Sequence, residues 1–108
     1  MNFKDFQSFI KKEDLRLRKK FNNPDEEKRL LSRVVKLSEE SGEFASEVML
    51  SMGDARDEKL SKFNKNNLED EYADVVIVAS MIAETLGIDM EKAIQDKIKK
   101  VEQRYKKS

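Results

Sequence analysis

Apolar residues recur along this chain at intervals of three and four residues, and charged residues fill most of the positions between them. That spacing places apolar side chains on one face of an α-helix and polar side chains on the other. Pro24, Gly53 and Gly87 fall where the pattern changes, and they divide the chain into four helical segments. We therefore expect an all-α, four-helix bundle-like fold in a single domain over residues 1–108, since globular domains usually contain about 100–150 residues.

The first predicted helix runs from about Phe3 to Phe21, and a longer second helix follows the sequence Asn23-Pro24-Asp25-Glu26. Asn23 is the expected N-terminal cap of the second helix, with Pro24 at the first helical position and Glu26 three residues after the cap. This helix is expected to stop near Gly53, a residue that suits the left-handed closing position. Residues 54–66 are polar and rich in lysine, and we expect them to form a mobile connection.

The third predicted helix is capped by Asn66 or Asn67 and ends at Gly87. Between residues 75 and 83 it is apolar on nearly every side, so we expect it to be the buried central element of the bundle. Asp89 is expected to cap a fourth helix, and the basic residues 104–107 are expected to fray into solvent. The predicted inner face of this fourth helix consists of Ala93, Ile94, Ile98 and Val101.

Composition narrows the chemistry that is open to this protein. Charged residues make up 41% of the chain, and 22 Lys and Arg residues balance 22 Asp and Glu residues. This balance disfavours a partner held mainly by charge, including a stable nucleic-acid partner. The chain contains neither cysteine nor histidine, which excludes disulfides, thiolate or imidazole metal ligands and a Ser-His-Asp triad. Carboxylates are left as the anionic metal ligands and catalytic groups.

No segment has the character of a membrane anchor or a secretion signal. Residues 1–9 have no apolar core, and the longest apolar stretch, residues 75–79, is far shorter than the ~20 residues that cross a bilayer. We therefore expect a soluble, cytoplasmic protein without a membrane partner.

The second predicted helix carries a pair of acids, Glu40 and Glu43, which are three residues apart and therefore neighbours on one helical face. Taken alone, such a pair is more typical of a solvated acidic surface than of a functional site. Gly42 counts against that interpretation, because glycine inside a helix costs roughly 1 kcal/mol relative to alanine. Its presence indicates close approach of another backbone or a ligand, although packing alone also explains it.

Glu71 and Asp74 repeat this spacing on the third predicted helix. At about 100° per residue, with Val75 at zero, Glu71 lies at about −40° and Asp74 at about −100°. Val78 and Met81 fall in the same sector, so the two carboxylates extend an apolar stripe toward the interior. A buried, unpaired carboxylate is costly enough that it normally finds a cation. That cation is either a metal ion or a Lys or Arg side chain in a structural salt bridge.

Two such acidic pairs on helices that pack antiparallel would bring four carboxylates to one point. All-oxygen ligation without imidazole or thiolate selects Mg²⁺, with Mn²⁺ as a substitute, over zinc or copper. Magnesium held by few protein oxygens usually binds a substrate phosphate as well and orients a water nucleophile. The acids therefore indicate hydrolysis of a phosphoanhydride.

Four motifs occur in order along the chain: Glu-x-Gly-Glu at 40–43, Glu-x-x-Asp at 71–74, Leu-Gly-Ile-Asp at 86–89, and Lys97 followed by Arg104-Tyr105. In this combination, roughly residues 28 to 105 resemble the MazG-like all-α NTP pyrophosphatases. The resemblance implies Mg²⁺-dependent cleavage of an NTP or dNTP between its α and β phosphates, which yields a monophosphate and pyrophosphate. The implied role is housekeeping of the nucleotide pool.

The resemblance also implies roles for individual residues. It makes Glu40, Glu43, Glu71 and Asp74 the catalytic metal ligands, with the attacking water positioned by one of the glutamates or by a bridging metal. Glu39 is implied as a supporting residue behind these ligands. Lys97 and Arg104 match basic positions near the triphosphate, although a basic helix end also complements the helix dipole. Lys36 either contacts phosphate or forms an ordinary i,i+4 pair with Glu40.

One position departs from the family pattern. Val101 stands where many relatives carry an asparagine that lies near the nucleotide, and valine cannot form that hydrogen bond. Nucleotide selection is therefore expected to be relaxed or altered, with residues 54–66 as a second source of recognition. The aromatic side chains available to stack on a base are Phe44, Phe63 and Tyr72.

The strongly apolar third helix is difficult for one small chain to cover, so we expect another subunit to cover it. Members of the family are dimers or tetramers, and we expect a homo-oligomer, with a tetramer favoured and a dimer as the alternative. The rival function is a non-enzymatic helical interaction module whose acids form salt bridges with a partner. That rival leaves the carboxylates on the apolar stripe unexplained.

Overall fold

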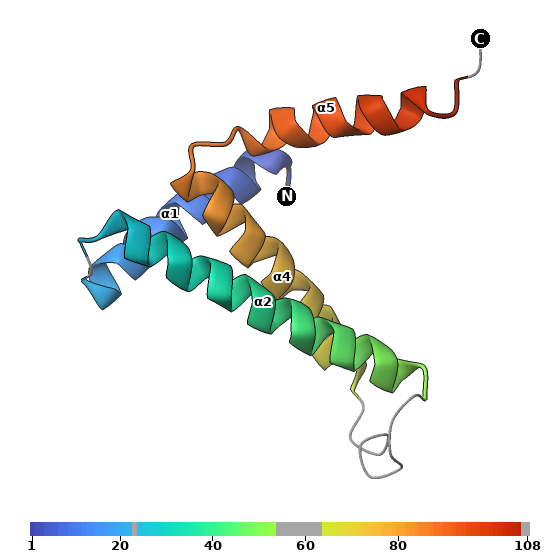
Figure 1. Cartoon of the computed structure of the whole chain (residues 1–108), viewed down its shortest axis with the longest axis horizontal. Coiled ribbons are helices and arrows are strands. Elements are labelled where there is room, and N and C mark those ends of the chain that lie inside the picture. Colours follow the sequence, from blue (N-terminus) through green and yellow to red (C-terminus); the bar gives the residue numbers. More distant parts are fainter. Residues whose placement is uncertain (23, 54–63, 107–108) are drawn as a thin grey trace. The chain divides into compact units, whose positions relative to one another are not determined.

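The computed structural model describes residues 1–22, 24–53 and 64–106, and these residues form four α-helices and no strand (Figure 1). The helices are α1 (Phe3–Phe21), α2 (Glu26–Ser51), α4 (Lys65–Thr85) and α5 (Met90–Gln103). The predicted all-α fold is thereby confirmed. The chain divides into two compact units, one of residues 1–24 and 80–108 and the other of residues 25–79. The prediction of one domain over residues 1–108 stays a prediction.

The first two helices begin at capping residues. Helix α1 has the predicted extent, and its start is closed by Asn2, whose side chain accepts a hydrogen bond from the Asp5 backbone N–H at 2.9 Å. Helix α2 is capped by Asp25, whose carboxylate accepts a hydrogen bond from the Lys28 N–H at 3.1 Å. The expected cap, Asn23, lies outside the described residues, and Pro24 precedes the helix. An aspartate cap adds its negative charge at the positive end of the helix dipole.

Helix α4 begins earlier than predicted. Asn64 precedes it and accepts a hydrogen bond from the Asn66 backbone N–H at 2.8 Å, so the expected cap at Asn66 or Asn67 is wrong, and both residues lie inside the helix. Asn64 takes the cap position because its side chain satisfies a backbone N–H group at the start of the helix that has no partner inside the helix. Residues 54–63 of the predicted connection lie outside the described residues.

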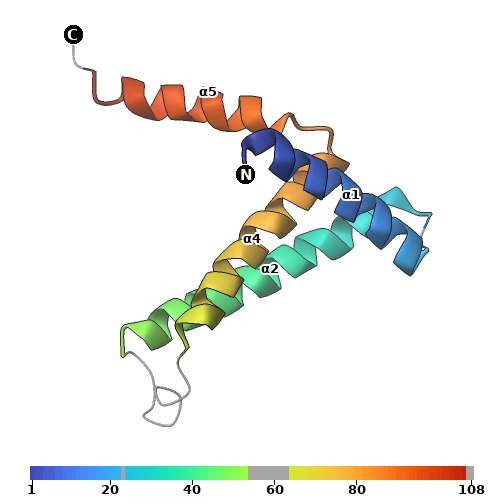
Figure 2. The ribbon, with the colours of Figure 1, turned by 180° about the vertical axis from the view of Figure 1, so that it is seen from behind.

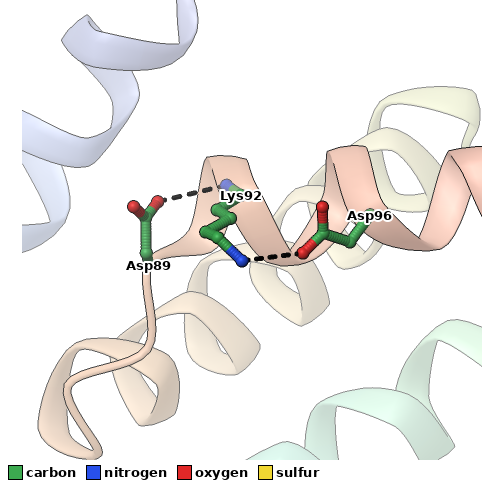
Figure 3. Close-up of polar contacts among 3 residues, drawn as sticks. All are labelled: Asp89, Lys92 and Asp96. Carbon is green, nitrogen blue, oxygen red and sulfur yellow. Dashed lines mark hydrogen bonds and ion pairs between the residues drawn. The ribbon is translucent and has the colours of Figure 1, made fainter.

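The predicted turn between the last two helices is confirmed. Gly87 has a φ of 70°, and the N–H groups of Gly87 and Ile88 donate to the carbonyls of Glu84 and Ala83 at 3.2 and 2.9 Å. This is the Schellman arrangement, which needs a left-handed residue and therefore favours glycine. Asp89 then caps α5 by accepting a hydrogen bond from the Lys92 N–H at 3.1 Å (Figure 3). The Lys92 ammonium also pairs with Asp96 at 3.0 Å, which supports the first turns of α5.

Burial differs from the prediction for the two C-terminal helices. Met81 is buried, but Val76 and Ala79 of the apolar run in α4 are exposed, so this run is not a fully buried central element. The predicted inner face of α5 is also open, since Ile94 is 49% and Ile98 is 54% exposed. The buried apolar residues among those described are Ile10, Met81 and Met90. A chain of this size with four helices does not supply enough side chains to bury the apolar residues of α4 and α5.

Two predicted helix ends and the prediction about membrane-spanning segments can be compared with the structure. Helix α5 ends at Gln103, and residues 104–106 are exposed as predicted, while Lys107 lies outside the described residues. Gly53 follows α2 with a φ of 76°, which confirms the predicted left-handed closing position. Among the residues described, no helix has the length and apolar character that crossing a bilayer requires.

Candidate functional site

Helix α2 and the first part of α4 bring three of the predicted acids together. These two segments belong to one compact unit and lie side by side in both views of the ribbon (Figures 1 and 2). Glu40 and Glu43 from α2 and Glu71 from α4 each offer one carboxylate oxygen, and these oxygens lie within 4.8 Å of one another. The i,i+3 spacing on α2 is what places both of its carboxylates on the face toward α4. We refer to Glu40, Glu43 and Glu71 as the acidic cluster.

Glu40 is the most buried member of the acidic cluster. Only 8% of its side chain is exposed, and its Oε1 accepts a hydrogen bond from the Lys36 ammonium at 3.0 Å. This hydrogen bond and the positive charge of Lys36 lower the pKa of Glu40, and the same hydrogen bond and the negative charge of Glu40 raise the pKa of Lys36. Lys36 is therefore the i,i+4 partner of Glu40, while its contact with phosphate stays a prediction. The second oxygen, Oε2 of Glu40, is buried and has no hydrogen-bond partner among the residues that the structure describes.

Glu71 lies half-buried across from the two α2 acids. Loss of hydration raises its pKa to about 7, and the carboxylates of Glu40 and Glu43 add to this shift through hydrogen bonding and charge repulsion. Within the described part of the chain, its Oε2 is also buried without a hydrogen-bond partner. A carboxyl group in this situation gains either from a proton or from a metal ion. The predicted inward position of this residue is confirmed.

Asp74 belongs to the same electrostatic group but stands at its edge. Its pKa is raised, first by lost hydration and then by the charges of Glu40 and Asp70. Asp74 is nevertheless an exposed residue, so the prediction that it faces the interior is wrong. Asp74 follows Glu71 by three residues, which rotates it by about 60° toward the edge of the helix, where it is exposed although it still interacts with Glu40 of α2. Its role as a metal ligand stays a prediction.

Gly42 lies between Glu40 and Glu43 in the sequence, but no contact among the described residues explains why glycine occupies this position. A Cβ atom added there would meet no other atom within 4 Å in the described structure. The expected close approach of a neighbouring backbone is therefore wrong within this chain. The glycine lies on the exposed side of α2, away from the acidic cluster.

The remaining predicted residues lie outside the acidic cluster. Glu39 is exposed on α2. Lys97 and Arg104 are exposed residues on and after α5, where Arg104 is the C-terminal cap, and they belong to the other compact unit. Val101 is half-buried on the same helix. Their predicted roles toward the nucleotide stay predictions.

Two of the predicted aromatic residues are in contact. The rings of Phe44 on α2 and Tyr72 on α4 meet edge to face, with centroids 6.0 Å apart. This contact lies beside the acidic cluster in sequence on both helices, and it helps to fix the register between them. Tyr72 keeps much of its surface exposed, while Phe63 lies outside the described residues.

The sequence interpretation missed one acid of this region, Glu47. Its Oε2 is buried and finds no hydrogen-bond partner in residues 1–22, 24–53 and 64–106, as is also true of the Oε2 atoms of Glu40 and Glu71. Glu47 follows Glu43 by four residues, so it lies one turn farther along the same face of α2. Besides this spacing, the sequence contains a second signal that could have drawn Glu47 into the predicted site. Residues 37–53 and 66–79 contain eight acidic residues and no Lys or Arg.

The donor set of the acidic cluster fits a hard divalent cation. Its members are all carboxylates, which Mg²⁺ and Mn²⁺ prefer, and two of them present buried oxygens that no group among the described residues satisfies. A cation would balance the repulsion that raises the pKa of Glu71. The arrangement can therefore hold a metal ion.

Comparison with known proteins supports the same conclusion. Searches of curated proteins and of solved structures gave no significant match. A family-level comparison matches residues 28–108 to the MazG nucleotide pyrophosphohydrolase domain, and this range contains the acidic cluster together with Lys97 and Arg104. Because the match covers well over half of the chain, the protein belongs to the MazG nucleotide pyrophosphohydrolase family.

Proposed function

We propose that the protein hydrolyses a nucleoside or deoxynucleoside triphosphate at the bond between the α and β phosphates, in a reaction that depends on Mg²⁺. Water adds across this anhydride, and the products are a nucleoside monophosphate and pyrophosphate. The observation that carries the proposal is the convergence of Glu40, Glu43 and Glu71 in a chain of this family, with two buried oxygens that have no partner among the described side chains and backbone.

In this proposal, Glu40, Glu43 and Glu71 hold the cation, with Asp74 as the fourth ligand at the edge of the group. Mn²⁺ substitutes for Mg²⁺. The cation, when bound, supplies positive charge that offsets the charge of the reacting phosphates and favours ionisation of water. One of the glutamates orients the attacking water by accepting a hydrogen bond from it, and Lys36 fixes the orientation of the Glu40 carboxylate through its 3.0 Å contact.

The basic residues complete the proposed assignment. Lys97 and Arg104 neutralise charge on the leaving pyrophosphate, and Glu39 supports the ligands from behind. Val101 removes one polar contact with the nucleotide, so we expect a broad or unusual substrate preference. We place the activity in the cytoplasm, in housekeeping of the nucleotide pool.

The test is a panel of canonical and modified NTPs and dNTPs incubated with the protein and Mg²⁺, with the released phosphorus species identified. We expect pyrophosphate and a monophosphate, and no turnover when EDTA replaces the metal. Release of orthophosphate would contradict the bond that we assign. No turnover on any nucleotide would instead favour the non-enzymatic interaction module.

We also propose that the protein acts as a homo-oligomer, either a tetramer or a dimer. The small number of buried apolar residues supports this proposal. Exposed apolar surface of this extent is stabilised by a bound partner, and another copy of the same chain is always available as that partner. Helix α2 offers an exposed face opposite its acids at alternating spacings of three and four residues. This face consists of Leu31, Val35, Ser38, Gly42, Ala45 and Met49, and it is continued by the C-cap residue Met52.

Gly42 provides a test of this contact. At the chain average of 41% charge, about three of the seven positions of the exposed face and its continuation would be charged, but none is. We expect Gly42→Leu to shift the protein toward smaller species in light scattering after size exclusion, because a large side chain would separate the paired helices. In a lone chain, Gly42→Ala would stabilise the helix by up to ~1 kcal/mol. An unchanged mass for Gly42→Leu would contradict packing through this face.

A further inference from the structure

Helix α1 carries an excess of positive charge that the proposed function does not use. Its residues include seven Lys or Arg and three Asp or Glu, a net charge of +4, whereas α5 contains four basic and three acidic residues. The neutral balance of the whole chain therefore conceals a basic first helix. This helix also precedes residue 28, where the match to the MazG domain begins, so the family match does not account for it.

The three acids of α1 are engaged in local contacts and leave most of its bases unpaired. Asp5 takes part in the capping box at the helix start. Glu13 accepts a hydrogen bond from Arg16 at 2.9 Å, and the buried Asp14 pairs with Arg18 at 3.2 Å. The remaining bases of the helix have no ion-pair partner among the residues that the structure describes, and these are Lys4, Lys11, Lys12, Lys19 and Lys20.

The exposed cations of α1 surround the outer half of the helix. At about 100° per residue, with the buried Ile10 at zero, Lys11 lies at about 100°, Lys19 at about 180° and Lys20 at about −80°. The cations extend along the helix from Lys4 to Lys20, which is ~24 Å at 1.5 Å per residue. We define the basic face by its exposed members, which are Lys4, Lys11, Lys12, Arg16, Lys19 and Lys20.

Two cations of the basic face lie over aromatic rings of the same helix. The Arg16 guanidinium is 5.9 Å from the ring centroid of Phe9, and the Lys20 ammonium is 5.5 Å from that of Phe21. These contacts hold the two charges close to the helix surface. Between the two edges of the basic face, Leu15 is the exposed apolar side chain of the described helix. The face is therefore suited to anionic groups and offers little apolar area.

The shape of the basic face favours a grooved polyanion over a flat one. The major groove of B-form DNA is about 12 Å wide, admits an α-helix and has phosphates along both edges, so cations at both edges of the face can reach phosphate. A membrane surface is flat, and Lys11 and Lys20 would point along it rather than into it. Stable binding to a membrane also needs apolar side chains that insert. The major groove of duplex RNA is too narrow for a helix.

We propose that the basic face binds the phosphate backbone of duplex DNA, with α1 lying along the major groove. The contacts join ammonium and guanidinium groups to phosphate oxygens, which carry no information about base sequence, so binding is independent of sequence. It is also weak and sensitive to salt, and it forms a transient contact rather than a stable complex. This binding goes beyond the proposed function and uses no residue of the acidic cluster.

The test is a titration of a fluorescently labelled DNA duplex of about 20 base pairs with the full chain in EDTA, followed by anisotropy at several NaCl concentrations. With four to six phosphate contacts, the logarithm of the binding constant should fall with the logarithm of salt concentration with a slope of about −4 to −5. Lys12→Gln/Lys19→Gln should reduce this slope by about 2 and the low-salt affinity by about 10-fold or more. Lys99→Gln/Lys100→Gln on α5 removes the same charge from exposed positions and should change neither value appreciably.

Each other outcome would overturn the inference. An unchanged slope in Lys12→Gln/Lys19→Gln, or an equal loss in both double variants, would show that α1 does not bind the DNA. Binding to phosphatidylserine vesicles without binding to DNA would assign the basic face to a membrane. If circular dichroism shows that Lys12→Gln/Lys19→Gln does not fold, the same measurement on Lys4→Gln/Lys11→Gln decides the question. No metal ion or nucleoside triphosphate is present, so failure here leaves the proposed function untouched.

Discussion

Replacing Glu71 by glutamine is expected to reduce nucleotide hydrolysis by about 100-fold or more while raising the thermal stability of the metal-free protein. The two effects have one cause. Glutamine has the shape of the protonated glutamate but cannot supply the negative charge that holds a cation. In the metal-free protein, that charge is poorly hydrated and repelled by Glu40 and Glu43, which is why the pKa of Glu71 is raised to about 7. Removing it relieves the repulsion.

Steady-state kinetics with Mg²⁺ and thermal unfolding with EDTA at pH 8 measure the two effects separately. Glu69→Gln on the same helix is the control, because Glu69 is exposed and lies outside the acidic cluster. It should leave both the hydrolysis rate and the melting temperature nearly unchanged. Loss of stability together with normal activity in Glu71→Gln would show that Glu71 is a structural residue and would contradict its role as a metal ligand.

The sequence was sufficient to predict the parts of the fold that depend on short-range interactions. The extent of α1, the left-handed positions at Gly53 and Gly87 and the cap at Asp89 all follow from hydrogen bonds within one turn of the helix. The convergence of the acidic cluster was also predictable, because the 3.6-residue period fixes which residues share a face. The choice among Asn64, Asn66 and Asn67 as cap was not predictable, since all three are good capping residues.

Burial was predicted less well, because it depends on how many neighbours the chain supplies. The apolar run of α4 and the apolar face of α5 have the spacing of buried surfaces, yet Val76, Ile94 and Ile98 are exposed in the single chain. Periodicity shows which face is apolar and gives no information about what covers it. Glu47 was missed for a related reason. In a chain with 41% charged residues, a single acid is expected to be exposed, and only the structure shows that its Oε2 is buried without a partner among the described residues.

The metal-free protein is expected to lose stability as the pH rises from about 4.5 to about 7, and Mg²⁺ or Mn²⁺ is expected to reverse this loss. The pKa of Glu71 is raised from its usual 4.5 to about 7, so the folded state holds this proton more tightly than the unfolded state does. Its contribution to stability is therefore full below 4.5 and disappears as the pH rises through 7. Asp74 acts in the same direction because its pKa is also raised. Glu40, whose pKa is lowered by Lys36, loses its stabilising contribution only at more acidic pH.

A divalent cation competes with the proton for the same oxygens, so its affinity should increase over the same pH range. At a metal concentration 100 times the dissociation constant, binding to the folded state alone stabilises by about 2.7 kcal/mol. We therefore expect the melting temperature shift caused by Mg²⁺ to be larger at pH 8 than at pH 5, with Ca²⁺ stabilising the protein without supporting turnover. In Glu71→Gln, both the decline between pH 4.5 and 7 and the metal-dependent shift should shrink, whereas Glu69→Gln should behave like the unmodified protein. A melting temperature that does not respond to millimolar Mg²⁺ at pH 8 would show that Glu40, Glu43 and Glu71 do not hold a cation, because three repelling carboxylates of this kind cannot bind one without gaining stability.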